Sequence, residues 1–307
     1  MRIAYDGLLQ KLRERSLTKS ALADALGISS RTMAKIGKGE TLSRRTLQKI
    51  AAFLDCDPAT LCREISDNAI LQRLRDEKRA GLSGGLYHEL QVRMTYNSNH
   101  IEGSQLTEAQ TRHIFETRTV GGGDAIPVDD ILETVHHFRT VDYVIDTAET
   151  PLSETIIKRL HFLLKHDTHD ALLPWVAVGD YKKRANMVSG RETTPPAEVP
   201  GAMRALLATY HQKSRATIHD IIAFHARFEQ IHPFQDGNGR VGRLIALKEC
   251  LRHHILPFII EDTKKHFYYR GLAEWNRERG WLTDTCLNGQ DTFKRLLDQL
   301  GIPYEKE

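Results

Sequence analysis

Residues 231–243, Ile-His-Pro-Phe-Gln-Asp-Gly-Asn-Gly-Arg-Val-Gly-Arg, join two segments whose apolar residues recur at helical spacing. The first segment, 217–231, is predicted to be a buried helix. Pro233 disfavours the α conformation for the residue before it, so this helix should end at His232. The second segment, about 239–253, is also predicted to be a helix. The short loop therefore opens directly into a helix N-terminus, and the rest of the chain is expected to be organised around it.

The residue types in this loop indicate phosphate chemistry. Its glycines let the backbone approach an anion, and the free N–H groups of a helix start favour negative charge. Arg240 and Arg243 share one face of the new helix, and Asp236 is a lone carboxylate of the kind that holds Mg²⁺ beside phosphates. His232 is suited to accept a proton near neutral pH. The loop is predicted to combine a base, a metal ligand and an anion cradle. A plain turn with solvated charges is the alternative.

The pattern His-Pro-Phe-x-Asp-Gly-Asn-Gly-Arg-x-x-Arg resembles the signature loop of the Fic family at all of its defining positions. Fic proteins typically transfer the AMP part of ATP to a hydroxyl group of a target protein. The resemblance implies an all-α Fic fold with a β-hairpin flap over residues 86–307, with ATP as substrate and Mg²⁺ as cofactor. Related kinases carry Lys where this chain has Gly239, so Gly239 favours nucleotidyl transfer.

The resemblance also implies roles for single residues. His232 would deprotonate the target hydroxyl, and Asp236 would hold Mg²⁺ on the α- and β-phosphates. Arg243 would reach the γ-phosphate. The other expected ATP contacts in the loop are Phe234, Gly237, Asn238, Gly239 and Arg240. Candidates for contacts with adenine and ribose, farther along the chain, are Tyr268, Tyr269 and Asn276.

A second motif precedes the predicted catalytic core. A helix is expected over 86–102 with Gly103 as its cap, so Glu102 lies in a last turn, where the helix dipole disfavours a carboxylate. The run Ser98-Asn-His-Ile-Glu-Gly103 resembles the inhibitory motif of Fic proteins. The resemblance implies that 86–103 is an inhibitory helix whose Glu102 pairs with Arg243 and blocks the seat of the γ-phosphate. A surface glutamate at a helix end is the alternative.

Residues 175–200 are the one extended region expected to be non-helical. Two short strands around a glycine turn predict a hairpin between about 181 and 194. This hairpin is similar to the Fic flap, which pairs with the target backbone as an added strand. Asn186, Met187 and Val188 are the candidates for target docking. An ordinary surface hairpin is the alternative.

The first 66 residues are expected to form a small helix-turn-helix domain of four to five helices. They hold 12 Lys and Arg against 7 Asp and Glu, a net charge of +5, whereas the remainder carries −2. A helix capped by Thr18, a turn at Gly27 and a helix capped by Ser29 or Ser30 resemble a lambda-repressor/Cro-type domain. The residues expected to face DNA are Ser30, Arg31, Thr32 and Lys35. A basic interaction module without a DNA role is the alternative, and residues 67–85 are expected to be a connecting helix and linker.

The overall composition is that of an ordinary soluble protein, with 40% hydrophobic and 27% charged residues in 307. No apolar run is long enough to span a bilayer, and the N-terminus lacks the apolar stretch of a signal peptide. The four cysteines have no metal-ligand spacing, which is typical of a reducing compartment. The chain is therefore expected to be cytoplasmic, without a membrane partner.

Together these features predict an autoinhibited protein adenylyltransferase with a DNA-binding N-terminal domain. The acceptor would be a Ser, Thr or Tyr hydroxyl of a target protein or of the enzyme itself. Two other functions stay open: a transcriptional regulator whose Fic domain senses nucleotide, and a de-AMPylase that runs the reaction in reverse. The target, the DNA site and the oligomeric state, including a homodimer, also stay open.

Overall fold

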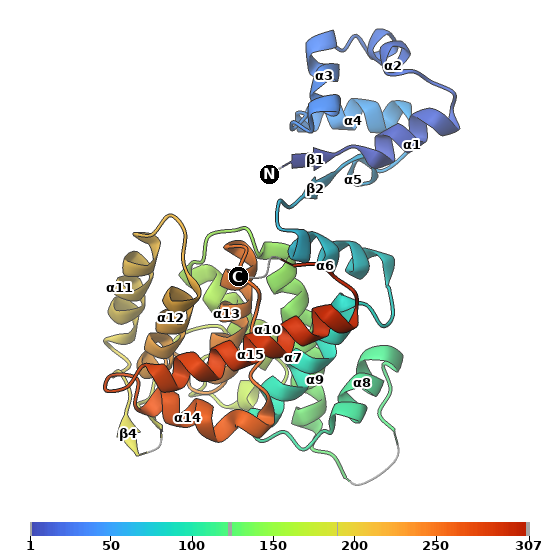
Figure 1. Cartoon of the computed structure of the whole chain (residues 1–307). Coiled ribbons are helices and arrows are strands. Elements are labelled where there is room, and N and C mark those ends of the chain that lie inside the picture. The colour runs from blue at the N-terminus through green and yellow to red at the C-terminus, as the bar shows by residue number, and fades with distance from the viewer. Residues whose placement is uncertain (1, 122–124, 189, 305–307) are drawn as a thin grey trace. The chain divides into compact units, whose positions relative to one another are not determined.

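The structure is a computed structural model that describes residues 2–121, 125–188 and 190–304 (Figure 1). Its internal packing divides the chain into two units, Met1–Gln72 and Arg73–Glu307. Helices dominate both units, and no helix in the described ranges is long and apolar enough to cross a membrane. The domain limits expected from the sequence stay predictions.

The first unit is a cluster of short helices around an aliphatic core. Leu8, Leu22, Ile50, Leu54 and Leu61 are fully buried in this core. Thr18, Ser29 and Ser43 each accept a hydrogen bond from a backbone N–H in the first turn of the helix that follows, which fixes where those helices begin. The helices are α1 (Asp6–Glu14), α2 (Lys19–Leu26), α3 (Ser30–Lys38), α4 (Arg44–Phe53) and α5 (Pro58–Leu61).

A strand pair that the sequence did not predict joins the two ends of this unit. β1 (Arg2–Ala4) and β2 (Arg63–Ile65) are antiparallel, with Ile3 opposite Glu64. Strands of three residues are too short to show a periodic pattern, and their pairing depends on residues far apart in the chain. The expectation of an all-helical segment therefore needs correction here. Helix α6 (Ala69–Ala80) follows.

One helix lies at the centre of the second unit. α13 (Asn238–Arg252) packs against four others, and nearly all of its residues are buried (Figure 1). The sequence pattern predicted this helix and the preceding one, including the end of the latter at His232. The four neighbours are α7 (Leu86–Ile101), α9 (Val128–Thr147), α10 (Glu154–Lys165) and α12 (Ile218–Ile231).

The remaining elements of this unit surround that bundle. The expected hairpin is present as β3 (Met187–Val188) and β4 (Arg191–Glu192), and Ser189 in its turn lies outside the described residues. The final helix begins at Gly280, although the glycine and asparagine residues in its first half weaken the helical signal of the sequence. The other elements are α8 (Glu108–Thr117), α11 (Val199–His211), α14 (Lys265–Ala273), α15 (Gly280–Gln299) and the 3₁₀ turns His169–Leu172 and Asp262–Lys264.

Candidate active site

The loop between α12 and α13 leads directly into the start of α13. His232 ends α12 in the left-handed conformation, with φ of +51°, and Gly237 precedes α13 with φ of +76°. The N-cap residue of α13, Gly237, provides no side-chain cap. The first N–H groups of a helix have no partner within it, so they form a site for an anionic group.

Two side chains of the loop hold its shape and do not face a ligand. Phe234 is fully buried and stacks on His161, with ring centroids 4.0 Å apart. The Asn238 side chain accepts a hydrogen bond from the Phe234 N–H at 2.8 Å and donates one to the Phe234 carbonyl at 2.9 Å. The structure therefore corrects the expected ATP contact of Phe234. The Asn238 amide is occupied by the loop itself, which leaves its backbone N–H for a phosphate.

The ring of His232 is unprotonated at neutral pH. Burial first, and then the charge of Lys182, lower its pKa to about 4, against opposite effects of the Glu229 backbone, Asp236 and Glu102. Its Nδ1 atom has no hydrogen bond within the described chain, and the nearest carboxylate oxygen, Oε2 of Glu229, is 3.8 Å away. A neutral, partly exposed imidazole can accept a proton, so the geometry supports a role as base.

Asp236 is an ionised carboxylate between two cations. Its Oδ2 atom accepts hydrogen bonds from Lys165 Nζ at 2.8 Å and from Arg240 at 3.1 Å. Burial raises its pKa, but the charges of Arg240 and Lys165 outweigh burial and hold the pKa well below the usual value. Glu133 binds the same two cations from α9. With Asp170, which also pairs with Lys165, three carboxylates and two cations thus form one network beside the loop.

These residues fit a magnesium ion. Magnesium is usually bound through one or two carboxylates together with substrate phosphates and water. Asp236 meets this need because it is ionised, its side chain is 54% exposed, and both of its cation contacts use Oδ2. Neither of these two contacts uses Oδ1.

Arg243 is buried and binds the end of α7. One of its terminal nitrogens lies 2.7 Å from Glu102 Oε1 and donates to the Ser98 carbonyl at 2.9 Å, while its Nε donates to Ser98 Oγ at 3.0 Å. The predicted pairing of Glu102 with Arg243 is thus present. It is not bidentate, because the guanidinium divides its donors between Glu102 and Ser98.

The Glu102 carboxylate occupies the anion cradle itself. A Cβ atom at position 239 would overlap Glu102 Oε1 and lie 3.0 Å from an Arg243 nitrogen, so only glycine admits this contact. The helix dipole disfavours this carboxylate at the C-terminal end of α7, but the dipole of α13 favours it at the N-terminal end of that helix. Any anion that enters the cradle must therefore displace it.

A tight turn fixes Glu102 in this place. The N–H of Ser104 donates to the Asn99 carbonyl and that of Gly103 to the His100 carbonyl, which is the Schellman arrangement at a helix end. Gly103 has φ of +105°, a conformation that favours glycine. The turn leaves Glu102 as the last residue before the chain leaves the helix.

The three candidates for adenine and ribose contacts lie in different surroundings. Tyr268 is buried, and its hydroxyl binds His225 at 2.7 Å and Arg243 at 3.3 Å, so the structure corrects its expected role. Tyr269 is half exposed and donates to the Ile101 carbonyl at 2.9 Å. Asn276 is exposed and accepts from Gln230 at 3.3 Å. Tyr269 and Asn276 stay predictions.

The hairpin is tied to the catalytic loop through its first residues. Asn186 donates to the Phe234 carbonyl at 3.1 Å, so this side chain anchors the hairpin and is not free for a target. Met187 is 63% exposed and Val188 is 41% exposed. Exposed apolar residues on a short unpaired edge suit the addition of a strand from another protein.

In the first unit, the expected DNA-facing residues gather at the start of α3. Ser30 and Arg31 are exposed, and Thr32 and Lys35 are partly exposed, while Met33 and Ile36 turn into the core. The Thr32 hydroxyl already binds Ser29 at 2.9 Å. Ser30, Arg31 and Lys35 are therefore the freer of the four expected contacts.

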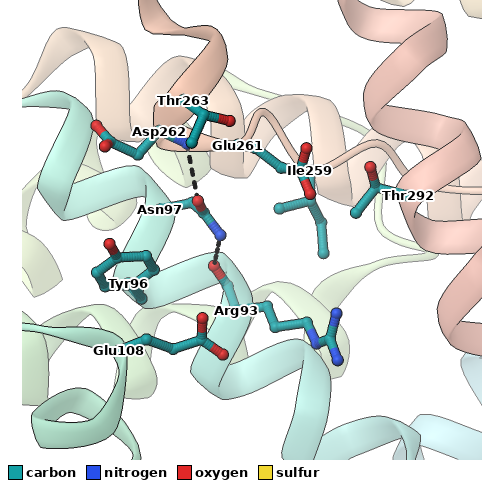
Figure 2. A pocket seen from close by; sticks show the side chains of 9 residues that line it. All are labelled: Arg93, Tyr96, Asn97, Glu108, Ile259, Glu261, Asp262, Thr263 and Thr292. Carbon is teal, nitrogen blue, oxygen red and sulfur yellow. Dashed lines mark hydrogen bonds between the residues drawn. The ribbon is translucent and has the colours of Figure 1, made fainter.

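A separate pocket lies beside α7. Its volume is about 290 Å³, and it opens beside Arg93, Tyr96 and Asn97 of this helix (Figure 2). Asn97 accepts from the Asp262 N–H at 2.8 Å across it. None of the site residues predicted from the sequence lines this pocket, so it adds nothing to the nucleotide site.

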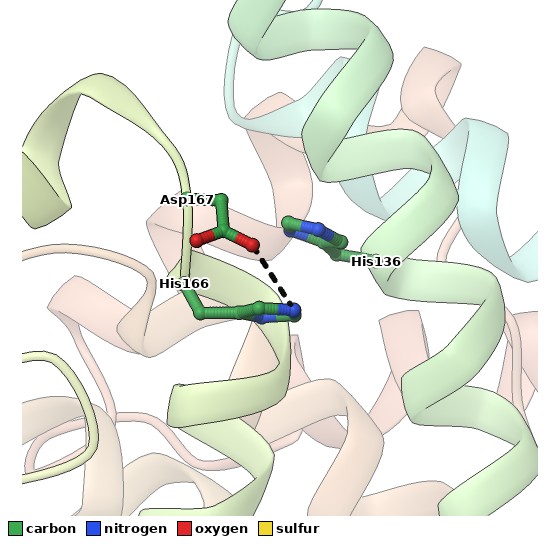
Figure 3. Close-up of side chains that lie close together, drawn as sticks. All are labelled: His136, His166 and Asp167. Carbon is green, nitrogen blue, oxygen red and sulfur yellow. Dashed lines mark ion pairs between the residues drawn. The ribbon is translucent and has the colours of Figure 1, made fainter.

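A histidine cluster on α9 and α10 also lies apart from the catalytic loop. Ligand atoms of His136, His166 and Asp167 lie within 4.8 Å of one another (Figure 3). The two rings stack at 4.0 Å and 18°, so their in-plane lone pairs run nearly parallel. Zinc needs ligands that converge tetrahedrally. This pair, with Phe162 stacked on His166, is therefore aromatic packing.

Sequence reasoning missed several residues of the site. Lys165 and Glu133 hold Asp236 and Arg240, and Lys182 lies behind His232. Glu229 is buried, and burial followed by the charge of Glu102 raises its pKa to about 8. The only sequence signal for these residues was a charge within an apolar helical pattern. Such a signal does not identify the distant residue that the charged side chain contacts.

Comparison with known proteins agrees with this geometry. The model of the Fic/DOC family matches residues 151–250, and that of the Cro/C1-type HTH DNA-binding domain matches residues 8–67. The chain contains a Fic domain. The Fic match includes α10, the hairpin, α12 and most of α13, which together carry the catalytic loop.

Curated relatives resemble the Fic domain and its surroundings. The chain is 27% identical over 197 residues to the protein adenylyltransferase Fic of Aedes aegypti, which covers 61% of this chain and 38% of that protein. It is 29% identical over 186 residues to that of Nematostella vectensis, covering 59% and 42%. The chain thus spans about two fifths of the length of these relatives.

Solved structures share the fold. A Fic domain containing signaling protein of Bacteroides thetaiotaomicron matches with a TM-score of 0.60 at 22% identity, covering 78% of this chain and all of that one. A Fic family protein of Desulfovibrio desulfuricans matches with a TM-score of 0.58 at 22% identity, covering 79% and 78%. The predicted fold class, a mostly helical Fic fold preceded by a helix-turn-helix domain, is confirmed.

Proposed function

We propose that this chain is a Mg²⁺- and ATP-dependent protein adenylyltransferase that modifies Ser, Thr or Tyr hydroxyls of a target protein or of itself. The observation that carries the proposal is the convergence of a neutral base, an ionised carboxylate and an uncapped helix start within one loop. The similarity to proteins named protein adenylyltransferase Fic supports the same reaction class.

In the proposed reaction, the target strand pairs beside the hairpin and brings its hydroxyl to His232. The Nε2 atom of His232 takes the hydroxyl proton, and the hydroxyl oxygen forms a bond to the α-phosphorus of ATP. The bond from that phosphorus to the bridging oxygen breaks, and pyrophosphate leaves. The N–H groups at the start of α13 and the Arg240 and Arg243 guanidinium groups stabilise phosphate charge. Bound Mg²⁺, held by Asp236, would neutralise part of that charge.

Glu102 is proposed to keep this site inactive. Its carboxylate lies on the anion cradle and against Arg243, the residue expected to seat the γ-phosphate. ATP would then bind with its α-phosphate away from the line of attack. Target identity, a homodimeric state and the expected cytoplasmic location stay predictions.

Replacing Asp236 by asparagine tests the metal role. The change removes the charge but keeps the size, so we expect the Mg²⁺ concentration for half-maximal activity to rise at least tenfold. Magnesium titration of AMP incorporation measures it. Asp170→Asn is the matched control, since Asp170 is a second carboxylate that binds Lys165. An equal Mg²⁺ requirement in both variants would remove Asp236 as the metal ligand.

The reaction product can be identified directly. Intact-mass and peptide mass spectrometry of protein incubated with ATP and Mg²⁺ should find an AMP adduct on a Ser, Thr or Tyr residue. A phosphate adduct would indicate a kinase. Incubation with a protein already carrying AMP tests the reverse reaction, and release of AMP by the parent chain would favour de-AMPylation.

The helix-turn-helix unit is proposed to bind DNA, and two variants separate its contacts. Arg31→Ala should relax sequence preference, because Arg31 lies at the exposed start of α3. Arg44 lies at the exposed start of α4 and is expected to contact a phosphate, so Arg44→Ala should weaken binding about equally for all sequences and lower the salt dependence by about one ion. Gel-shift titration against DNA upstream of the chain's own reading frame measures both. No shifted band at low salt would leave a protein-interaction module.

A further inference from the structure

Lys182, just before the hairpin, is a buried cation that binds neutral oxygens. Only 3% of the residue is exposed, and its ammonium donates to Asn186 Oδ1 at 2.7 Å and to Thr193 Oγ1 at 2.6 Å. Among the described residues it has no carboxylate partner. Burying a charge without a counter-ion costs folding free energy, which indicates that Lys182 has a functional role at this position.

Lys182 holds the chain on both sides of His232. Its ammonium lies 3.5 Å from the Ile231 carbonyl, and its backbone N–H donates to the Pro233 carbonyl at 2.8 Å. His232 between them has φ of +51°, a conformation that non-glycine residues adopt only when their surroundings enforce it. Lys182 and Asn186, which binds the Phe234 carbonyl, thus tie the base of the hairpin to the catalytic turn.

The same ammonium acts on the charge of the His232 ring. After burial, Lys182 is the largest influence that lowers the pKa of His232. The Glu229 backbone and the Asp236 and Glu102 carboxylates act the other way. Burial lowers the pKa of Lys182 itself to about 8, so Lys182 still carries its charge at neutral pH.

We propose that Lys182 is a positioning residue for the base: it holds His232 in its left-handed turn and connects that turn to the hairpin. This inference rests on the proposed transfer reaction. The charge of Lys182 keeps the His232 ring unprotonated in neutral and mildly acidic solution. Its contacts also connect the hairpin, where the target strand would pair, to the base that activates the target hydroxyl.

Histidine NMR titration of the whole chain tests the electrostatic part without any catalysis. The resonance absent from His232→Ala identifies the ring. In the parent its midpoint should lie near pH 4, and Lys182→Met should raise it by about one unit, as loss of a nearby cation does. Lys182→Arg should restore the parent value. Lys183→Met, at the exposed neighbour, should leave it unchanged.

The pH dependence of AMP transfer tests the consequence. The rate should fall on the acid side as His232 takes up a proton, and Lys182→Met should move this acid limb upward by the same shift as the NMR midpoint. If Lys182 had a purely structural role, Lys182→Met would lower the rate equally at every pH, and the pH of the acid limb would not change. Lys182→Gln, which keeps a hydrogen-bonding side chain, gives the same two readouts if the methionine variant unfolds.

The outcomes separate this inference from the proposed function. An unchanged NMR midpoint in both folded variants overturns the inference, whatever the enzyme does. A raised midpoint in a chain that transfers no AMP in any variant supports the effect of Lys182 on His232 and removes the adenylyltransferase proposal.

Discussion

Glu102→Gly is expected to raise self-modification with AMP by about 10²- to 10³-fold, the usual value of one preorganised group that stabilises charge in the transition state. The change removes the carboxylate that lies on Gly239 and frees Arg243 for the γ-phosphate. Glycine is tolerated at a helix end, so the fold should survive. The affinity for ATP should change less than the rate, because the variant changes the position of the bound phosphates more than the strength of their binding. AMP incorporation over time in parent and variant measures the effect.

Two further variants decide whether the gain comes from Arg243. The double change Glu102→Gly with Arg243→Ala should lose the gain, because the freed arginine would no longer be present. Glu198→Gly, at an exposed glutamate next to α11, should stay at the parent rate. Autoinhibition by Glu102 fails if the single variant is no faster than the parent across several protein substrates.

His232→Ala is expected to lower AMP transfer by about 10²- to 10⁴-fold, the usual contribution of general acid–base catalysis. ATP binding should persist, because the phosphates are held by the start of α13 and its arginines. Isothermal titration calorimetry measures binding, and AMP incorporation in the Glu102→Gly background measures the rate.

His219→Ala provides the matched control for this loss. His219 is an exposed histidine in the first turn of α12, and its removal should leave the rate within twofold of the parent. Should His232→Ala transfer AMP as fast as the His219→Ala control, another group must accept the hydroxyl proton.

Local sequence signals predicted the centre of the fold well. The periodic apolar residues and Pro233 predicted the two helices of the catalytic pair, and a helix begins after Thr18 as the side chain of that residue suggested. The pairing of Glu102 with Arg243, residues 141 apart, came from two recognised motifs and not from local chemistry.

Long-range packing explains what the sequence left out. The roles of Phe234 and Tyr268 depend on burial, which no local pattern reveals for a single aromatic residue in a glycine-rich loop or a short helix. Lys165, Glu133 and Lys182 meet partners from other elements, so their spacing along the chain carries no sign of the contact.

The central claim, transfer of AMP, is tested most directly by comparing two labelled forms of ATP. Glu102→Gly protein is incubated with Mg²⁺ and ATP carrying radioactive phosphorus at either the α- or the γ-position, and bound label is read after denaturing electrophoresis. The account predicts label from the α-position alone, and none when His232 is also alanine. Label from the γ-position, or α-label that persists without His232, would contradict it.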